Sequence, residues 1–194
     1  MSGRPKIFDN EAVIEKATDL FWSQGYEITS TEDLLRAMGI GKGSFYLAFK
    51  GGKKELYEKV LEKVSQKELN TLKDNIAKSQ APVEEIKKLF RSIAKAPKAT
   101  NLKGCIFGNT LAEFSNNDAQ IMQIAARHLK ELETVFQLTI EQAQAAGQMQ
   151  SKDDSHLLAR YLITTWNGLG ISRRLYPDPK ALSGLIEMQL GILD

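Results

Sequence analysis

The chain has 194 residues, of which 42% are hydrophobic and 26% are charged, and its formal net charge is +2. This balance excludes a disordered chain and a uniformly basic nucleic-acid-binding surface, and it is typical of a soluble globular protein. No run of about 18 apolar residues and no apolar leader is present, so we expect a cytoplasmic protein without a membrane span. The single cysteine, Cys105, cannot form an internal disulfide, which fits a reducing compartment.

Apolar residues recur at helical spacing almost everywhere, and no useful stretch alternates with a period of two. We therefore predict an all-α fold. The first helix is expected to run from about Asn10 to Gln24, with Asp9 as its cap and Gly25 as its stop.

The segment TSTEDLLRAMGIGKGSFYLAF, residues 29–49, is the most informative part of the chain. Ser30 is predicted to cap a short helix, with Asp33 completing a capping box and Gly39 ending the helix. A second short helix is expected to begin near Lys42. Two short helices joined by a glycine turn are typical of the helix-turn-helix, whose second helix enters the DNA major groove.

The same region is locally basic. No Asp or Glu occurs between Leu34 and Lys54, where Arg36, Lys42, Lys50, Lys53 and Lys54 give a local charge of +5. This charge lies where a polyanion would dock on a helix-turn-helix. The alternative is an ordinary helical hairpin with solvated lysines, which the spacing alone does not exclude.

The glycines of this segment do not indicate a nucleotide site. Gly39, Gly41 and Gly43 follow no predicted strand, and the GxxxxGK pattern of a phosphate-binding loop is absent.

Further helices follow in chain order, separated by Pro, Gly and polar residues. They are expected from Lys53 to the middle seventies, from Pro82 to Pro97, from about Gly104 to Phe114, from Asn117 or Asp118 to Gly147, from Asp153 or Asp154 to Pro177, and after Pro179, with a polar connector at 98–103.

The last two helices are too apolar for the surface of a monomer. We expect them to pack against a second copy of the chain as a four-helix interface. The alternative is that both helices belong to the core of one chain. The penultimate helix also has a second, partly apolar face at Leu157, Tyr161, Thr164, Gly168, Ile171 and Leu175. The residues predicted for the dimer interface are Leu158, Leu162, Leu169, Leu182, Leu185 and Ile186.

The order of these elements resembles the TetR family of bacterial transcriptional repressors. The resemblance is carried by the GRP arm at 3–5, by LFWSQGYEITSTEDLLRAMGIGKGSFYLAF, and by the start of the next helix at 53–56. GCIFGN at 104–109 and AAGQM at 145–149 look like one common subgroup. The resemblance implies a helix-turn-helix DNA-binding domain at 1–52, a connecting helix at 53–80, and a ligand-binding and dimerisation domain at 81–194.

The resemblance also implies roles at the DNA. Lys42, Gly43 and Ser44 would begin the recognition helix, with Lys42 donating to guanine and Gly43 allowing a close backbone approach. Tyr46 would give its hydroxyl to a phosphate. Further phosphate contacts are expected from Thr31 at a helix N-terminus and from the cation of Lys53.

The roles of Arg4 and Lys53 at the DNA each have an alternative. Arg4 lies on an N-terminal arm that either enters an adjacent minor groove or is a solvated tail. The segment between Phe49 and Lys53 holds three residues, Lys50 to Gly52, where the family usually has two. Gly52 would then replace the usual polar cap, with Lys54 as a substitute for Lys53.

The resemblance implies an effector site in the C-terminal domain. The alternative for the candidate residues is ordinary core packing. Cys105, at a predicted helix N-terminus, is either a sensor of oxidants or electrophiles or a small buried hydrophobe. The candidates that could line an apolar cavity are Phe90, Cys105, Phe107, Met122, Phe136, Tyr161 and Trp166.

We therefore predict a ligand-responsive regulator, a repressor, that binds double-stranded operator DNA as a homodimer and is released by a small apolar or amphipathic effector. The alternative is a redox- or electrophile-sensing repressor acting through Cys105. An enzyme is disfavoured because no acid/base pair, nucleophile constellation or metal cluster is visible. His128 and His156 are isolated, so no metal site and no cofactor are predicted. A helical interaction module would dimerise without binding DNA.

Overall fold

The computed structural model describes residues 10–114, 118–176 and 178–194. Within these residues the regular secondary structure is all helical, without a β-strand, which confirms the predicted all-α fold. The elements are α1 (Asn10–Gln24), α2 (Thr31–Met38), α3 (Lys42–Ala48), α4 (Gly52–Lys78), α5 (Pro82–Lys95), α6 (Lys98–Lys103), α7 (Ile106–Glu113), α8 (Ala119–Ala145), α9 (Ser155–Leu175), α10 (Pro179–Leu190) and a 3-10 turn, η1 (Gly191–Leu193).

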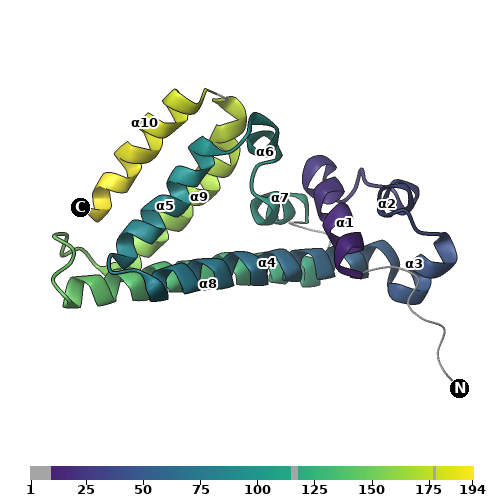
Figure 1. The fold of residues 1–194 in the computed structure, drawn as a ribbon, viewed down its shortest axis with the longest axis horizontal. Helices are drawn as coiled ribbons and strands as arrows, with labels where there is room; N and C mark the ends of the chain where they lie inside the picture. Colours follow the sequence, from purple (N-terminus) through teal and green to yellow (C-terminus); the bar gives the residue numbers. More distant parts are fainter. Residues whose placement is uncertain (1–9, 115–117, 177) are drawn as a thin grey trace, which may run out of the picture.

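Two long helices set the shape of the molecule. Helices α4 and α8 pack side by side along its long axis (Figure 1). Helices α1–α3 lie at one end of this pair, and α5, α9 and α10 lie at the other. Helices α6 and α7 lie between the two ends, where α6 contacts both α1 and α9.

The predicted helix-turn-helix forms for local reasons that the sequence contains. The Ser30 hydroxyl accepts a hydrogen bond from the Asp33 N–H at 3.1 Å, and the Asp33 carboxylate accepts one from the Ser30 N–H. This confirms the predicted capping box. Gly39 ends α2 with a φ of 71°, in the left-handed region that favours glycine. Phe45 and Phe49 point into the core rather than toward solvent.

The extra residue before α4 is accommodated differently from the prediction. Gly51, not Gly52, takes the cap position, and Gly52 begins α4 with a φ of 66°. A Cβ atom at Gly52 would lie 3.4 Å from the Tyr46 ring, so both the backbone and the space favour glycine there. The Glu55 carboxylate accepts a hydrogen bond from the Gly51 N–H at 2.7 Å, which holds the added residue in place.

Other boundaries also follow the caps. The predicted polar connector at 98–103 is instead helix α6, which begins after Pro97 and ends at Gly104 with a φ of 69°. Asp118 caps α8 and Asp154 caps α9, which resolves both alternatives. Asp9, Asn117 and Pro177 lie outside the described residues.

The hydrophobic core has two clusters. The first joins α1–α3 and the start of α4 to α7 and the start of α8, and the second joins α5, α9 and α10 to the remainder of α4 and α8. Trp166 on α9 packs against both clusters. The helix-turn-helix therefore shares its core with helices from the C-terminal part of the chain.

The second cluster corrects the predicted dimer interface. The six residues assigned to that interface pack inside their own chain, because α9 and α10 turn this face toward α5 and α8. A residue whose surface is covered within its own chain offers no area to a second chain. Of the set Leu158, Leu162, Leu169, Leu182, Leu185 and Ile186, only Leu185 is partly rather than fully buried.

His128 ties three helices together in the middle of the molecule. It lies on α8, its Nδ1 is 2.9 Å from the Ser65 hydroxyl on α4, and its ring stacks on Phe107 of α7 with 3.6 Å between the ring centroids. Its side chain is only 2% exposed, and this burial lowers its pKa from 6.5 to about 4. The folded protein therefore holds His128 neutral.

We expect His128 to make stability depend on pH. Between pH 6.5 and about 4 the unfolded chain binds a proton that the folded chain excludes, so this contribution is complete above pH 6.5 and is lost as the pH falls. The shift corresponds to a loss of about 2 kcal/mol in the free energy of unfolding between pH 7.5 and pH 5. Urea titrations of His128→Gln should lack this component, whereas His156→Gln should retain it. An identical pH dependence in both variants would contradict the assignment.

Candidate nucleic-acid interface and its link to the C-terminal helices

One face of α3 is open to solvent and carries no acid. Lys42, Gly43, Tyr46 and Leu47 are exposed on it, and Lys50 follows in the loop. Leu47 is 80% exposed, and a Cβ atom at Gly43 would meet nothing within 4 Å. Ser44, beside this face, is partly buried. A face with two lysines, a phenol and an open backbone stretch suits the groove and phosphates of a DNA duplex.

Lys53 does not have the free cation that the sequence predicts. Its ammonium donates to the backbone oxygens of Tyr26 and Thr29 at 3.0 and 3.1 Å and lies 4.1 Å from the centre of the Tyr26 ring. It therefore holds the turn between α1 and α2, and we remove it from the expected phosphate contacts. The proposed substitute is also engaged, because Lys54 pairs with Asp118 at 2.6 Å.

The remaining predicted contacts lie near α3 or outside the described part of the chain. Thr31 is the first residue of α2 and is partly exposed. Arg36, one of the five basic residues counted above, is exposed and lies 3.5 Å from Asp33. Arg4 lies outside the described residues.

A carboxylate from the C-terminal part of the chain accepts two hydrogen bonds from the turn before α2. The two oxygens of Glu113, at the end of α7, accept hydrogen bonds from the N–H groups of Tyr26 and Glu27 at 3.1 and 2.7 Å. Gly25 adopts a φ of 86° beneath them, and a Cβ atom there would lie 3.3 Å from the carboxylate. This contact fixes the position of α2 relative to α7.

Other contacts strengthen the same junction. The Trp22 indole N–H on α1 donates to the backbone oxygen of Gly104 at 2.8 Å, and Lys103 pairs with Asp19. The hydroxyls of Tyr57 and Thr110 lie 2.8 Å apart between α4 and α7. The segment from α6 to α7 is therefore bonded at several points to the end of the molecule that holds α1–α3.

The predicted effector residues do not form one group. Phe90, Phe136 and Trp166 make ring contacts in the second cluster, with 5.4 Å between the centroids of Phe90 and Trp166. Phe107 and Cys105 lie in the first cluster, and Met122 packs against it. Tyr161 is exposed on the outer side of α9, so its assignment to an interior cavity is wrong.

Cys105 occupies the cap position of α7, as predicted. Its sulfur accepts a hydrogen bond from the Gly108 N–H at 3.5 Å, but the side chain is buried. Burial raises the pKa of the thiol, and this effect outweighs the lowering by the Gly108 bond and by Arg173. The protonated thiol is the less reactive form.

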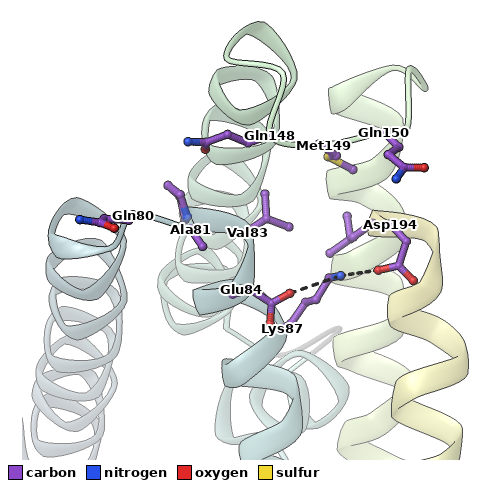
Figure 2. Close-up of a pocket in the computed structure, with 11 residues that line it drawn as sticks. Gln80, Ala81, Val83, Glu84, Lys87, Gln148, Met149, Gln150 and Asp194 are labelled. Carbon is purple, nitrogen blue, oxygen red and sulfur yellow. Dashed lines mark hydrogen bonds and ion pairs between the residues drawn. The ribbon is translucent and has the colours of Figure 1, made fainter.

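Two cavities in the described part of the chain lie away from the predicted effector residues. One, of about 490 Å³, is lined by residues from the start of α5, the α8–α9 loop and the C-terminus, where Lys87 pairs with Glu84 and with Asp194 at 3.5 and 2.5 Å (Figure 2). Another, of about 470 Å³, lies between α4 and α8 around Ser65 and Arg127. Neither is lined by a predicted effector residue.

Among the described residues, no group of three or more His, Cys, Asp or Glu side chains is placed to hold a metal ion. No helix among these residues has the length and apolar character needed to cross a membrane.

Sequence reasoning missed two residues at this interface. Leu47 could have been noticed, because it is an apolar residue off the inward spacing of Phe45 and Phe49. Glu113 had no signal in the sequence, since the turn that it binds lies 86 and 87 residues away.

Comparisons with known proteins cover both ends of the chain. Residues 13–60 match the model described as "Bacterial regulatory proteins, tetR family", and residues 82–188 match "Tetracyclin repressor-like, C-terminal domain". The chain is 27% identical to the HTH-type transcriptional regulator YezE of Bacillus subtilis (strain 168) over 194 residues, covering 99% of this chain and 100% of YezE. It is 30% identical to the HTH-type transcriptional repressor ComR of Escherichia coli (strain K12) over 175 residues, covering 89% of this chain and 82% of ComR.

Solved structures share the fold. A cysteine mutant of the TetR family transcriptional regulator CifR, complexed with a 26-bp double-strand operator DNA, has a TM-score of 0.81 and 22% identity, covering 99% of this chain and 100% of that chain. The reduced form of Escherichia coli NemR has a TM-score of 0.84 and 16% identity, covering 95% and 96%.

The Glu113 contact can be tested directly. In Glu113→Gln an amide replaces the carboxylate, so one of the two N–H groups loses its acceptor and faces another donor. We expect the free energy of unfolding to fall by about 1–2 kcal/mol. Hydrogen exchange at the amides of Tyr26 and Glu27 should accelerate. Glu141→Gln, the same change at an exposed carboxylate on α8, should alter neither quantity. Unchanged exchange at Tyr26 and Glu27 in Glu113→Gln would refute the role.

Proposed function

Because this chain belongs to the TetR family of bacterial regulatory proteins, we propose that it represses transcription by binding operator DNA as a homodimer and releases the DNA when a small molecule enters its C-terminal helices. It is a helix-turn-helix transcriptional regulator and not an enzyme. A bacterial regulator that binds operator DNA must reach the chromosome, which lies in the cytoplasm, so we propose a cytoplasmic location.

The observation that carries the DNA-binding proposal is the acid-free, exposed face of α3. Lys42 reaches a guanine edge, while Gly43 lets the backbone approach the bases and Ser44 lies beside them. Tyr46 gives its hydroxyl to a phosphate; the side chain is exposed, and its ring rests against Gly52.

Two further residues complete the proposed contacts. Leu47 is exposed on the same face and supplies an apolar surface for a thymine methyl group. Thr31, at the start of α2, contacts a phosphate.

The proposed dimer uses the outer face of α9. Its residues are spaced four, three, four, three and four apart, which is the spacing of core positions in paired helices. Ile171 is 71% exposed, and Gly168 has open space around it, so a second helix can approach closely. On α10, Met188 and Gly184 are also exposed. The α9 residues are Leu157, Tyr161, Thr164, Gly168, Ile171 and Leu175.

A dimer is needed for operator recognition. The seven-residue helix α3 reads only a few base pairs, and a two-fold dimer places two such helices in major grooves about one helical turn apart. Any movement that changes the distance between the two copies of α3 therefore lowers affinity for the operator.

The proposed release follows the contacts around α6 and α7. The Arg174 side chain on α9 donates to the backbone oxygen of Lys103 at 2.6 Å and to Asn109 at 2.9 Å. A shift of α9 is thereby passed to the segment whose Glu113 holds the turn before α2. The coupling is reciprocal: operator must weaken effector binding by the same factor as effector weakens operator binding.

Sensing through Cys105 is the alternative trigger. Its support is weaker because burial keeps the thiol protonated. Cys105→Ser separates the two, since it removes a response to oxidants and leaves a response to a reversible ligand.

The DNA site is tested with an operator selected from a random duplex library. Lys42→Ala should weaken binding to that operator by about 1–3 kcal/mol and relax the preference at one base pair, as measured by fluorescence anisotropy. Lys152→Ala, which removes an exposed lysine from the α8–α9 loop, is the control and should bind like the parent. If the selection yields no sequence, or if Lys42→Ala binds as tightly as Lys152→Ala, the assignment is wrong.

The proposed dimer face on α9 can be tested by introducing a charged side chain into it. Ile171→Glu places a carboxylate in the proposed interface, where its desolvation should weaken association by at least about 2 kcal/mol. Sedimentation should show monomers with unchanged helix content, and operator affinity should fall. Leu138→Glu makes a similar change at an exposed residue on α8 and should remain dimeric. A dimeric Ile171→Glu protein would exclude this face.

A further inference from the structure

The inner face of α9 carries a buried cation that has no ion-pair partner among the described residues. The Arg173 side chain is 7% exposed, and its Nε has no hydrogen-bond partner among the described residues. Its neighbour Arg174 differs, because it is exposed and its guanidinium bonds to Lys103 and Asn109. A buried polar atom without a partner is rare in folded proteins, and an unpaired buried charge is costly.

A second unpaired donor lies on the same face. Trp166 precedes Arg173 by seven residues, close to two helical turns, so both side chains leave α9 on one side. The indole Nε1 of Trp166 is buried and has no partner in the described part of the chain. Phe90 holds the indole ring in an edge-on contact at 5.4 Å between centroids.

Two acidic groups lie near Arg173, but neither is paired with it in the described part of the chain. Glu68 and Cys105 are the acidic groups whose charge reaches it, and Arg174 adds a like charge. Desolvation raises the pKa of Glu68 to about 7 although 48% of its side chain stays accessible, and burial raises that of Cys105. Glu68 also lies 3.5 Å from His128 Nε2. Neither acid makes a hydrogen bond or ion pair with the Arg173 guanidinium among the described residues.

The position between the two donors is close to α7. Gly170 lies between Trp166 and Arg173 on α9, and a Cβ atom there would lie 3.2 Å from the Cβ of Cys105. The ring of Phe90 contacts Trp166, and the ring of Phe136 contacts Phe90. Donors without acceptors, set among apolar rings, call for a ligand with an anionic acceptor and an apolar body.

From these contacts we infer that the effector is a small carboxylate, whose oxygens are bound by Arg173 and Trp166 between α7 and α9 and whose apolar part displaces side chains of the core. A guanidinium accepts a carboxylate through two parallel hydrogen bonds. This inference rests on the proposed function, because it names the chemical class of its effector. It also links the effector to the dimer, since the opposite face of α9 is the proposed interface.

The first test needs no ligand. Removing an unpaired buried cation relieves its desolvation, so Arg173→Met should raise the urea midpoint of the full-length protein. Arg174→Met is the matched control: it loses two hydrogen bonds and should lower the midpoint. If Arg173 is instead a structural residue with a counter-ion, Arg173→Met will lower the midpoint, and the inference fails.

The second test uses carboxylates with neutral partners of the same shape. Benzoate and hexanoate should raise the thermal midpoint of the protein, whereas benzamide, hexanamide and inorganic phosphate should not. Calorimetry should show the carboxylates binding at least about tenfold more weakly to Arg173→Gln. Arg160→Gln, the same change at an exposed arginine of α9, should keep the parent affinity. Equal binding of acid and amide, equal binding of phosphate, or Arg173-independent binding would each overturn the inference.

Operator release separates this inference from the proposed function. Carboxylate binding that depends on Arg173 but leaves operator affinity unchanged would support the anion site and refute the proposed release mechanism. Operator release by benzamide or hexanamide, without binding by either carboxylate, would support the release mechanism and refute the carboxylate class.

Discussion

The structure depends on one shared hydrophobic core between the helix-turn-helix and the helices behind it. Helices α1–α3 and the start of α4 pack on one another, and their buried residues continue into the same cluster as those of α7 and the start of α8. Tyr57 lies fully buried at this junction, where its ring meets Phe21 and Phe114 and its hydroxyl meets Thr110. Because the cluster is continuous, we expect a displacement of α7 to alter the packing of α1 and α4.

Hydrogen bonds fix how the helices of this shared core are positioned relative to one another. Apolar packing brings α7 and the DNA-binding end together, but it is not directional. The Glu113 carboxylate is directional, since it accepts from two specific N–H groups next to a glycine whose conformation brings them within reach. Arg174 makes an equivalent connection from α9 to the start of α7. The segment from α6 to α7 is thus bonded through Glu113 to the turn between α1 and α2. Through Lys103 and Asn109 it is bonded to α9, the helix with the proposed dimer face.

The lysines near α3 have two roles: some stabilise the fold, and the others are exposed to solvent. Lys53 and Lys54 are adjacent to the helix-turn-helix in the sequence, yet one binds backbone oxygens and the other pairs with Asp118. Lys42 and Lys50 remain exposed. Formal charge therefore overstates the cation available to DNA, because part of it stabilises the scaffold that presents α3. Arg173 differs from these lysines because its charge is buried. In the proposed site it is a carboxylate ligand, and not DNA, that binds this charge.

The sequence by itself determined most of the helices, α6 excepted, and the helix-turn-helix, because these depend on local signals. Ser30 with Asp33, the left-handed Gly39 and the apolar spacing of each helix act within a few residues of one another. The tertiary structure decided which faces are used. Leu162 and Ile171 lie on one helix and are equally apolar, but only packing against α5 and α8 shows that Leu162 is core and Ile171 is exposed. The partners of Lys53 and Glu113 were likewise undetermined, since a side chain's contacts across tens of residues depend on how the helices pack and not on their spacing along the chain.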